Sequence, residues 1–219
     1  MQWIVLLFFG STILAVIAYR WVPVYVTPLM VVRCCQQVAH GEKLRLKHHW
    51  VSLDEMSIYM PVAVMASEDQ LYLKHHGFDF KALNAAIEES KAGKRHRGGS
   101  TISQQTAKNV FLWPDHSWVR KGLEVYFTGL IELIWGKHRI MEVYLNSLEM
   151  GDGIYGAEAV AQQHFGRSSS DLTRANCALI AATLPNPLRF SSKNPSPYML
   201  KRQTAIMKQM RHIGVFPKK

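Results

Sequence analysis

Cysteine is scarce in this chain: its 219 residues include only Cys34, Cys35 and Cys177. None of them forms a C-x-x-C pair, and no spacing of Cys and His resembles a zinc site. We therefore expect the thiols to be structural or incidental. Because no disulfide framework can be read from them, cysteine usage does not indicate the compartment.

Acidic residues are also few, with 16 Asp and Glu against 26 Lys and Arg and a formal net charge of +10. A basic surface favours phosphate-bearing partners such as nucleic acid, anionic lipid or a pyrophosphate, and composition does not separate these. The hydrophobic content of 48% excludes a mainly disordered chain. The length suits one domain with a core and an appendage.

Charge is missing altogether from residues 3–18, WIVLLFFGSTILAVIA. Arg20 follows with the aromatic residues Tyr19 and Trp21, as in the belt at a membrane interface. With this flank the segment approaches the roughly 20 residues that cross a bilayer. A cleaved signal peptide would need a basic start and an A-x-A-like site, and neither is present. We predict an uncleaved transmembrane anchor at residues 1–26, rather than a signal peptide or a buried core helix.

Long alternating runs of β-branched residues are missing after the anchor, where apolar residues recur at three and four and Pro and Gly punctuate them. Residues 27–50 read as a membrane-proximal connection and residues 51–213 as one mainly helical domain. Helices are expected at residues 54–74, 79–92, 101–112, 117–135, 137–147, 154–164, 171–184 and 197–213. No Lys or Arg precedes the anchor, so the positive-inside rule leaves its orientation open.

An acidic pair, Glu68-Asp69, follows the apolar run MPVAVMA. On a helix, Glu68, Tyr72 and His75 lie at i, i+4 and i+7 and share one face. At the edge of an apolar run the charged form of Glu68 would be desolvated and its pKa raised, which suits a general acid or base. An ordinary amphipathic helix end with a surface Glu–His pair explains the same pattern. This segment alone favours that simpler interpretation.

A glycine-rich segment, RGGSTISQQTAKN, leads into another expected helix. Thr101 and Gln104 have capping-box spacing, and free N–H groups at such a helix start bind anions. Gln104 and Lys108, at i and i+4, extend one polar face. A plain capped helix after a basic loop fits equally well. The spacing G-x-x-x-x-G-K-[ST] is absent, which excludes a P-loop.

The segment VRKGLEVYFTGLIELIW places two cations next to a carboxylate. Arg120 and Lys121 reach Glu124 at i+4 and i+3, which describes many surface ion pairs. However, Glu124 shares its helix face with Phe127 and Ile131, so this face soon becomes apolar. A half-buried carboxylate with two adjacent cations suits a phosphate-bearing substrate.

Together these segments resemble the peptidoglycan glycosyltransferase domain of the penicillin-binding proteins, and more closely the monofunctional biosynthetic peptidoglycan transglycosylases. The family pattern E-D-x-x-F-x-x-H-x-G appears as EDQLYLKHHG, and G-x-S-T-I-[ST]-Q-Q-x-x-K-N appears as GGSTISQQTAKN. RKGLE and KHRIMEVYLN match two further motifs, and the resemblance covers about residues 50–213. Three residues depart from the pattern: Tyr72 replaces the usual Phe, His116 stands where relatives often carry Arg, and Asn176 stands where an acid is common.

The resemblance implies a mainly α, lysozyme-like fold with a head and a smaller jaw, in which VFLWPDHSW (110–118) would dip into the bilayer. It also implies a single-pass protein of the inner membrane, with its catalytic domain in the periplasm. The motifs S-x-x-K and K-T-G are absent, so no transpeptidase is expected.

The chemistry implied by the resemblance is polymerisation of lipid II, with the growing glycan held as the donor by its polyprenyl pyrophosphate. Glu68 would act as the general base at the acceptor 4-hydroxyl, with inversion at C1 of the donor sugar. Glu124 would orient the neighbouring cations and a divalent cation, or balance developing charge. Residues expected at the substrate by motif position are Asp69, Tyr72, His75, Ser100, Thr101, Gln104, Gln105, Lys108, Asn109, His116, Arg120, Lys121, Lys137 and Asn146. Family members use a divalent cation, expected to be Mg²⁺, but no ligand set can be read here.

Three other interpretations remain open at this point. A lytic, lysozyme-like hydrolase would use Glu68 as acid and water as acceptor, but it would need neither the cations nor an anchor. An inert membrane scaffold would bind lipid II, or proteins of cell-wall synthesis or division, without polymerising anything. A basic nucleic-acid module is the third interpretation, and the expected anchor argues against it.

Overall fold

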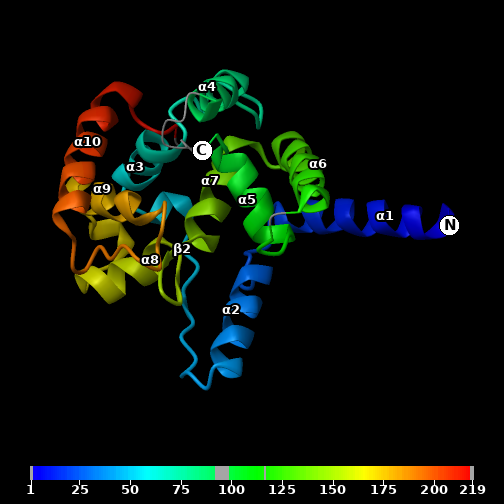
Figure 1. The fold of residues 1–219 in the computed structure, drawn as a ribbon, viewed down its shortest axis with the longest axis horizontal. Coiled ribbons are helices and arrows are strands. Elements are labelled where there is room, and N and C mark those ends of the chain that lie inside the picture. Colours follow the sequence, from blue (N-terminus) through cyan, green and yellow to red (C-terminus); the bar gives the residue numbers. More distant parts are fainter. Residues whose placement is uncertain (1, 92–98, 116, 218–219) are drawn as a thin grey trace.

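The structure is a computed structural model that describes residues 2–91, 99–115 and 117–217. It is mainly helical, with one small sheet, which confirms the predicted fold class (Figure 1). The helices are α1 (Gln2–Tyr19), α2 (Pro28–Ala39), α3 (Tyr59–Glu68), α4 (Phe80–Lys91), α5 (Ile102–Phe111), α6 (Trp118–Ile134), α7 (Gly136–Ser147), α8 (Ala157–Val160), α9 (Arg174–Thr183) and α10 (Pro197–Ile213). Shorter helical turns lie at Leu53–Glu55, Ala161–Phe165 and Ser169–Asp171.

The sheet contains β1 (Lys47–His48), β2 (Glu149–Gly151) and β3 (Ile154–Tyr155), in the order β1-β3-β2. Strand β3 runs parallel to β1 and antiparallel to β2. The sheet therefore ties the segment that follows α2 to the chain after α7.

The single helix expected over residues 54–74 is wrong, because α3 ends at Glu68. Asp69 leaves the helical conformation, with φ −158° and ψ 83°, and its carboxylate accepts a hydrogen bond from Ile102 N at 3.0 Å. This contact with α5 turns the chain away from the helix axis. Glu68, Tyr72 and His75 consequently do not share a helix face.

Two further segments differ from the expected pattern. Residues 27–50, expected as a connection, contain α2, which begins where Thr27 Oγ1 accepts a hydrogen bond from Met30 N at 3.3 Å and Pro28 occupies the first turn. The helix expected at 154–164 is instead β3, the short α8 and a π-helical turn. The other expected helices correspond to α4–α7, α9 and α10.

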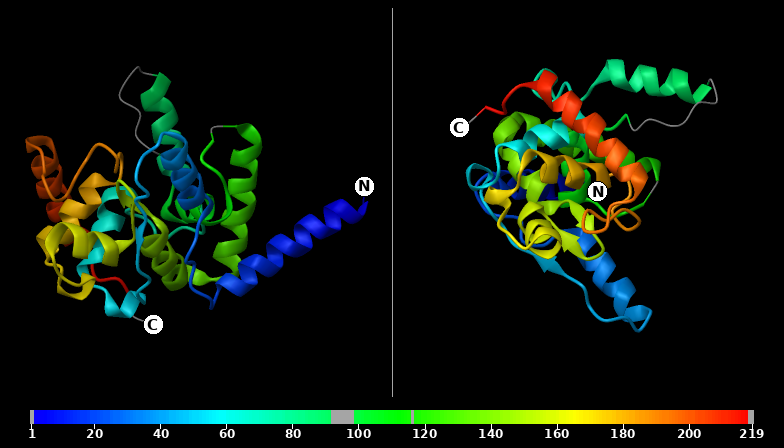
Figure 2. Two further views of the ribbon diagram at one scale, coloured as in Figure 1. Left: turned by 90° about the horizontal axis from the view of Figure 1, so that it is seen from below. Right: turned by 90° about the vertical axis from the view of Figure 1, so that its left-hand side faces the viewer.

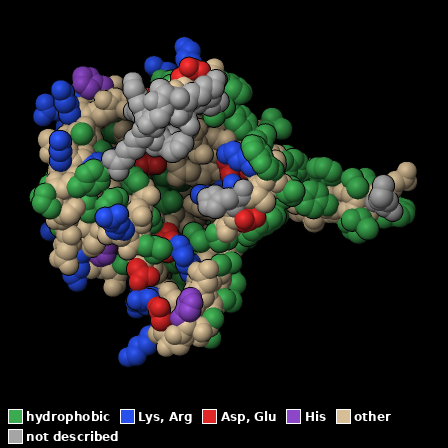
Figure 3. Space-filling view, viewed as in Figure 1, with side chains coloured by type: hydrophobic (Ala, Val, Ile, Leu, Met, Phe, Trp, Pro, Cys, Tyr) green, Lys and Arg blue, Asp and Glu red, His purple; other side chains and the backbone are tan. Residues whose placement is uncertain are grey.

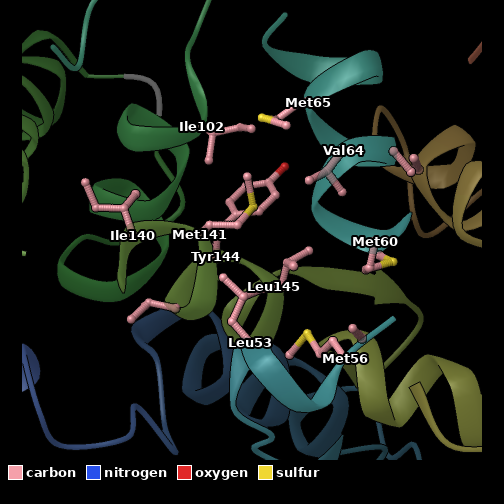
Figure 4. Close-up of a cluster of buried hydrophobic side chains, with 14 of the residues drawn as sticks. Leu53, Met56, Met60, Val64, Met65, Ile102, Ile140, Met141, Tyr144 and Leu145 are labelled. Atoms are coloured by element: carbon pink, nitrogen blue, oxygen red, sulfur yellow. The ribbon is translucent and has the colours of Figure 1, made fainter. Parts of the chain in front are cut away.

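The helices pack in two groups around one core. Helices α3, α9 and α10 contact one another, and α5, α6 and α7 form the second group (Figures 1 and 2). Figure 4 shows side chains of both groups meeting, with Met60 and Val64 from α3 facing Tyr144 and Leu145 from α7. The shared core holds the C-terminal end of α3 against α5.

Gly77 closes the turn that follows α3. Its φ of +88° favours glycine, and a Cβ there would lie 2.9 Å from Cγ2 of Thr128 on α6. Gly77 O accepts a hydrogen bond from Thr101 Oγ1 at 2.6 Å, next to the start of α5. This glycine therefore allows the turn to approach both helices closely.

Helix α1 projects from the body of the molecule (Figures 1 and 3), which it contacts through its middle, where Thr12 Oγ1 lies 3.0 Å from Tyr126 Oη of α6, and through its C-terminal end. There Trp135 Nε1 donates to Val16 O at 2.7 Å, and Arg139 Nη2 donates to Tyr19 O at 2.9 Å. These donors satisfy carbonyls that lack partners near a helix end. Among the described residues, α1 is the one helix long and apolar enough to cross a bilayer. It is consistent with a single-pass anchor.

Candidate active site

Glu68, the last residue of α3, lies where the two helix groups meet. Its Oε1 accepts a hydrogen bond from Ser67 Oγ at 2.8 Å and lies 3.8 Å from Nη2 of Arg202 on α10. Its Oε2 accepts from Nε2 of Gln105 on α5, at 3.4 Å. The side chain remains 16% exposed. The carboxylate is therefore held in place from three sides while it stays open to a ligand.

Gln105 is itself oriented by a buried tyrosine. Its Oε1 accepts a hydrogen bond from Tyr144 Oη at 3.3 Å, which leaves the amide nitrogen to face Glu68. Burial raises the pKa of Tyr144 well above its usual range, and the charges of Glu68 and Asp69 add to this effect. Tyr144 therefore stays protonated and keeps donating to Gln105.

Ser67 and Arg202 were missed by sequence reasoning. Arg202 Nη2 donates to Ser67 Oγ at 3.1 Å, so both residues support the same carboxylate. Ser67 also lies 3.2 Å from Ala181 O of α9. The sequence contains no local pattern that points to Arg202, because α10 has the pattern of an ordinary basic helix. Its contact with α3 depends on the tertiary fold.

A cluster of cations surrounds Glu124 on α6, and both predicted ion pairs are confirmed. Arg120 Nη1 lies 2.7 Å from Oε2 of Glu124, and Lys121 Nζ bonds to Oε1. Glu124 and Arg120 are buried, whereas the Lys121 side chain is 40% exposed. Each carboxylate oxygen thus holds one cation, and Lys121 presents its charge to solvent.

Lys108 brings a third cation to this cluster from α5. Burial lowers the pKa of Lys108; Glu124 opposes the shift, and the positive charges of Arg120 and Lys121 reinforce it. Gln105 and Lys108 are three residues apart on α5, so they are neighbours on its surface. Helix α5 therefore connects the Glu68 carboxylate with the cations around Glu124.

The sequence model of the transglycosylase family matches residues 36–211, a range that contains both parts of this site. The chain belongs to the transglycosylase family. It is 60% identical to a biosynthetic peptidoglycan transglycosylase of Bacteroides thetaiotaomicron, over 98% of this chain and 86% of that protein. Proteins of the same name in Bdellovibrio bacteriovorus and Caulobacter vibrioides are 50% and 52% identical, over 95% and 91% of this chain and 85% and 84% of theirs. The fold is the lysozyme-like glycosyltransferase fold, and the chain is a peptidoglycan glycosyltransferase.

The start of α5 in this transglycosylase is occupied by the protein's own side chains. The predicted capping box is confirmed: Thr101 Oγ1 accepts from Gln104 N at 3.2 Å, and Gln104 Oε1 accepts from Thr101 N at 3.0 Å. The buried Asp69 accepts from Ile102 N, and it also lies 3.0 Å from His75 Nε2. An anion does bind this helix N-terminus, but that anion is Asp69. Asp69 and His75 hold the turn that follows α3 against the start of α5.

The remaining residues expected at the substrate lie in different surroundings. Tyr72 is fully buried; its hydroxyl donates to Lys137 O at 2.8 Å, and Lys137 Nζ lies 4.5 Å from its ring centroid. Asn109 is buried and Ser100 is exposed. His116 lies outside the described residues. Contact of these residues with substrate stays a prediction, although the position of Tyr72 is that of a core residue.

Asn146 is fully buried and joins α7 to the segment before α3. Its Nδ2 donates to Val51 O at 2.9 Å and to Glu142 O at 2.8 Å, while its Oδ1 accepts from Val51 N at 3.0 Å. We expect Asn146→Ala to lower the free energy of unfolding by about 2–4 kcal/mol, because it leaves backbone groups unpaired. Urea denaturation would measure this loss. Unchanged stability with weakened lipid II binding would instead place Asn146 at the substrate.

Proposed function

We propose that this transglycosylase polymerises lipid II into β-1,4-linked glycan strands, with Glu68 as the general base. One observation supports this most directly: α5 places Gln105 against Glu68 and, one turn further, Lys108 beside the cations around Glu124. Helix α5 thereby connects a base at the end of α3 with a cationic site for a pyrophosphate on α6. Such a pair suits glycosyl transfer from a pyrophosphate-linked sugar.

Glu68 removes the proton from the 4-hydroxyl of the terminal GlcNAc of the acceptor lipid II. The oxygen attacks C1 of the donor MurNAc, the bond from C1 to the pyrophosphate oxygen breaks, and the configuration at C1 inverts. The electron pair of the broken bond leaves with the polyprenyl pyrophosphate. Ser67, Gln105 and Arg202 support this step because their contacts fix the direction of the carboxylate.

Lys108, Arg120 and Lys121 stabilise the negative charge that develops on the leaving pyrophosphate. Both oxygens of Glu124 already accept from Arg120 and Lys121. Glu124 therefore acts by holding these cations in place. Orientation of the neighbouring cations is also part of what the family resemblance implies for Glu124.

A divalent cation, Mg²⁺ in our proposal, would neutralise part of the charge on the phosphates of the substrates. Among the residues that the structure describes, no group of three or more His, Cys, Asp or Glu side chains could hold a metal ion. The protein side chains do not form a preformed cage there.

Helix α1 anchors the enzyme in the inner membrane with its catalytic domain in the periplasm, so that the site and the lipid substrates share one membrane surface. The exposed side chains at the start of α6 support this arrangement. Trp113, Trp118 and Val119 are 43%, 90% and 71% exposed, within or next to the segment expected to enter lipid. Apolar side chains so exposed suit a bilayer surface.

Labelled lipid II tests the proposed function directly. We expect the full chain in detergent with Mg²⁺ to produce long glycan chains, which muramidase then degrades. Isolated peptidoglycan serves as a second substrate. Release of muropeptides from it, without polymer from lipid II, would favour a lytic enzyme, and bound lipid II without any product would favour a scaffold.

The lowered pKa of Lys108 predicts how activity depends on pH. Its ammonium loses its proton, and the site a positive charge, at a lower pH than an ordinary lysine does. We expect kcat/KM for lipid II to fall on the alkaline side at a pH below the usual lysine range. In Lys108→Arg this fall should move to higher pH, because a guanidinium stays charged. Profiles of kcat/KM against pH, measured for both proteins in one detergent, would show the shift. Coincident profiles would contradict a role for the Lys108 charge in binding or reaction of lipid II.

A further inference from the structure

The outward face of α2 is apolar. Val31, Cys35 and Val38, at i, i+4 and i+7, lie on one side of the helix, and all three are exposed. Val31 is 50% and Val38 63% exposed. The outer face of a helix on a soluble domain is normally polar. On α2 the apolar stripe points away from the protein.

The opposite face holds α2 firmly on the domain. Met30 and Gln37 are buried there, and Gln37 Oε1 accepts a hydrogen bond from Arg45 N at 2.8 Å. Arg33 Nη2 lies 3.5 Å from Oε2 of Glu149 on β2. Because these contacts fix the rotation of the helix, the apolar stripe is presented in a defined direction.

The position of α2 relative to α1 brings this stripe close to the bilayer. Eight residues separate the end of α1 at Tyr19 from the start of α2 at Pro28, which limits their separation to about 30 Å. Figures 1 and 2 show α2 running crosswise to α1 near the inner end of α1. Figure 3 shows hydrophobic side chains along the edge of α2 on the side from which α1 projects. A helix so placed lies along the surface of a membrane that α1 crosses.

The segments on both sides of α2 continue the same surface. Before it, Trp21, Tyr25 and Val26 are 69%, 61% and 59% exposed. After it, Leu44 is 63% exposed beside the exposed Lys43. Apolar and aromatic side chains mixed with cations are typical of segments at a membrane interface.

We propose that α2 is an interfacial helix, which lies on an anionic lipid bilayer with Val31, Cys35 and Val38 at the boundary of the acyl chains. The proposal rests on the proposed anchoring by α1. Its energetic basis is burial of the apolar stripe together with attraction of the basic flanks to anionic headgroups. The contact adds a second point of attachment, which fixes how the catalytic domain is oriented on the membrane.

A bilayer explains the stripe better than a second protein molecule does. The stripe begins a few residues after the expected anchor, and the exposed Arg20 and Lys43 lie on either side of it in the sequence. A bilayer lies within reach of α2 in every molecule whose α1 is inserted. A second copy of the chain would have to bring a matching apolar surface to the same place.

Spin labels can test the proposal on the full chain in vesicles of phosphatidylcholine and phosphatidylglycerol. In a Cys34→Ser background, Cys35 is the exposed native thiol, and Cys177 is buried. Val31→Cys and Val38→Cys, each combined with Cys35→Ser, complete the stripe. Collision with oxygen, which concentrates in lipid, is compared with collision with a water-soluble nickel complex.

Three further positions serve as references in the Cys34→Ser, Cys35→Ser background. Leu7→Cys on α1 reports whether the anchor is inserted. Lys208→Cys on α10 gives the oxygen-to-nickel collision ratio of a side chain in water, which is the aqueous value. Gln36→Cys is exposed on α2 but points away from the stripe. We expect the oxygen-to-nickel ratio on the stripe to exceed that at Lys208→Cys by about threefold or more. At Gln36→Cys the ratio should be close to the aqueous value.

The possible results separate this proposal from the proposed anchoring. A lipid value at Leu7→Cys with aqueous values along the stripe would overturn the interfacial helix and leave the anchor intact. An aqueous value at Leu7→Cys would overturn both. Labels on the stripe that neither reagent reaches would show that protein, such as a second copy of the chain, covers it. Because Cys35 is native, its reading requires no substitution at a stripe position.

Discussion

Replacement of Glu68 by Gln is expected to lower the rate of lipid II polymerisation by at least about a hundredfold, the lower end of the contribution of a positioned base. The amide keeps the shape of the side chain but cannot take the proton from the acceptor hydroxyl. Glu68 lies at a helix end and is only partly buried, so we expect the variant to fold normally. The measurement is the initial rate with labelled lipid II in detergent.

Two controls make this result specific to the base. Glu55→Gln makes the same chemical change at an exposed carboxylate, whose bond from Ser52 the amide oxygen can also accept, and we expect the parent rate. Lipid II binding by Glu68→Gln should remain close to that of the parent. Similar polymerisation by Glu68→Gln and the parent would remove Glu68 from the role of base and point to another carboxylate.

Local patterns predicted the parts of the site that depend on one helix. The pairs of Arg120 and Lys121 with Glu124 follow from i+4 and i+3 spacing, and both form. The capping box of Thr101 and Gln104 likewise involves four consecutive residues. Such contacts require only that the helix forms, and the sequence contains that information.

Contacts between distant segments were not predictable in this way. The pattern over residues 54–74 predicted a helix through Asp69, yet Asp69 leaves the helix and its carboxylate accepts from Ile102 N on α5. Arg202 reaches Glu68 only because α10 packs against α3. Residues 27–50 were expected as a connection, whereas α2 forms there and contacts β2 through Arg33 and Glu149. In each case a tertiary contact overrides or completes the local pattern.

Replacement of Glu124 by Gln is expected to lower both stability and activity, because Glu124 balances a buried cation. Loss of its charge leaves the Arg120 guanidinium buried without a counter-charge, which we expect to reduce the free energy of unfolding by about 3–5 kcal/mol. Polymerisation should also fall, since neither Arg120 nor Lys121 would be held beside the pyrophosphate. Urea denaturation and initial rates measured well below the unfolding transition would separate these effects.

Lys121→Met is the matched variant, because it removes a cation from the same carboxylate at a more exposed position. We expect it to lose less stability than Glu124→Gln, because Lys121 is partly exposed and Glu124 keeps its contact with Arg120. Its polymerisation rate should nevertheless fall by about a hundredfold, the loss typical of one group that stabilises developing negative charge. Equal losses of stability in both variants, with the Lys121→Met rate intact, would mean that the cluster only supports the fold. A selective loss of rate in Lys121→Met would assign the exposed cation to the leaving group and the buried pair to its support.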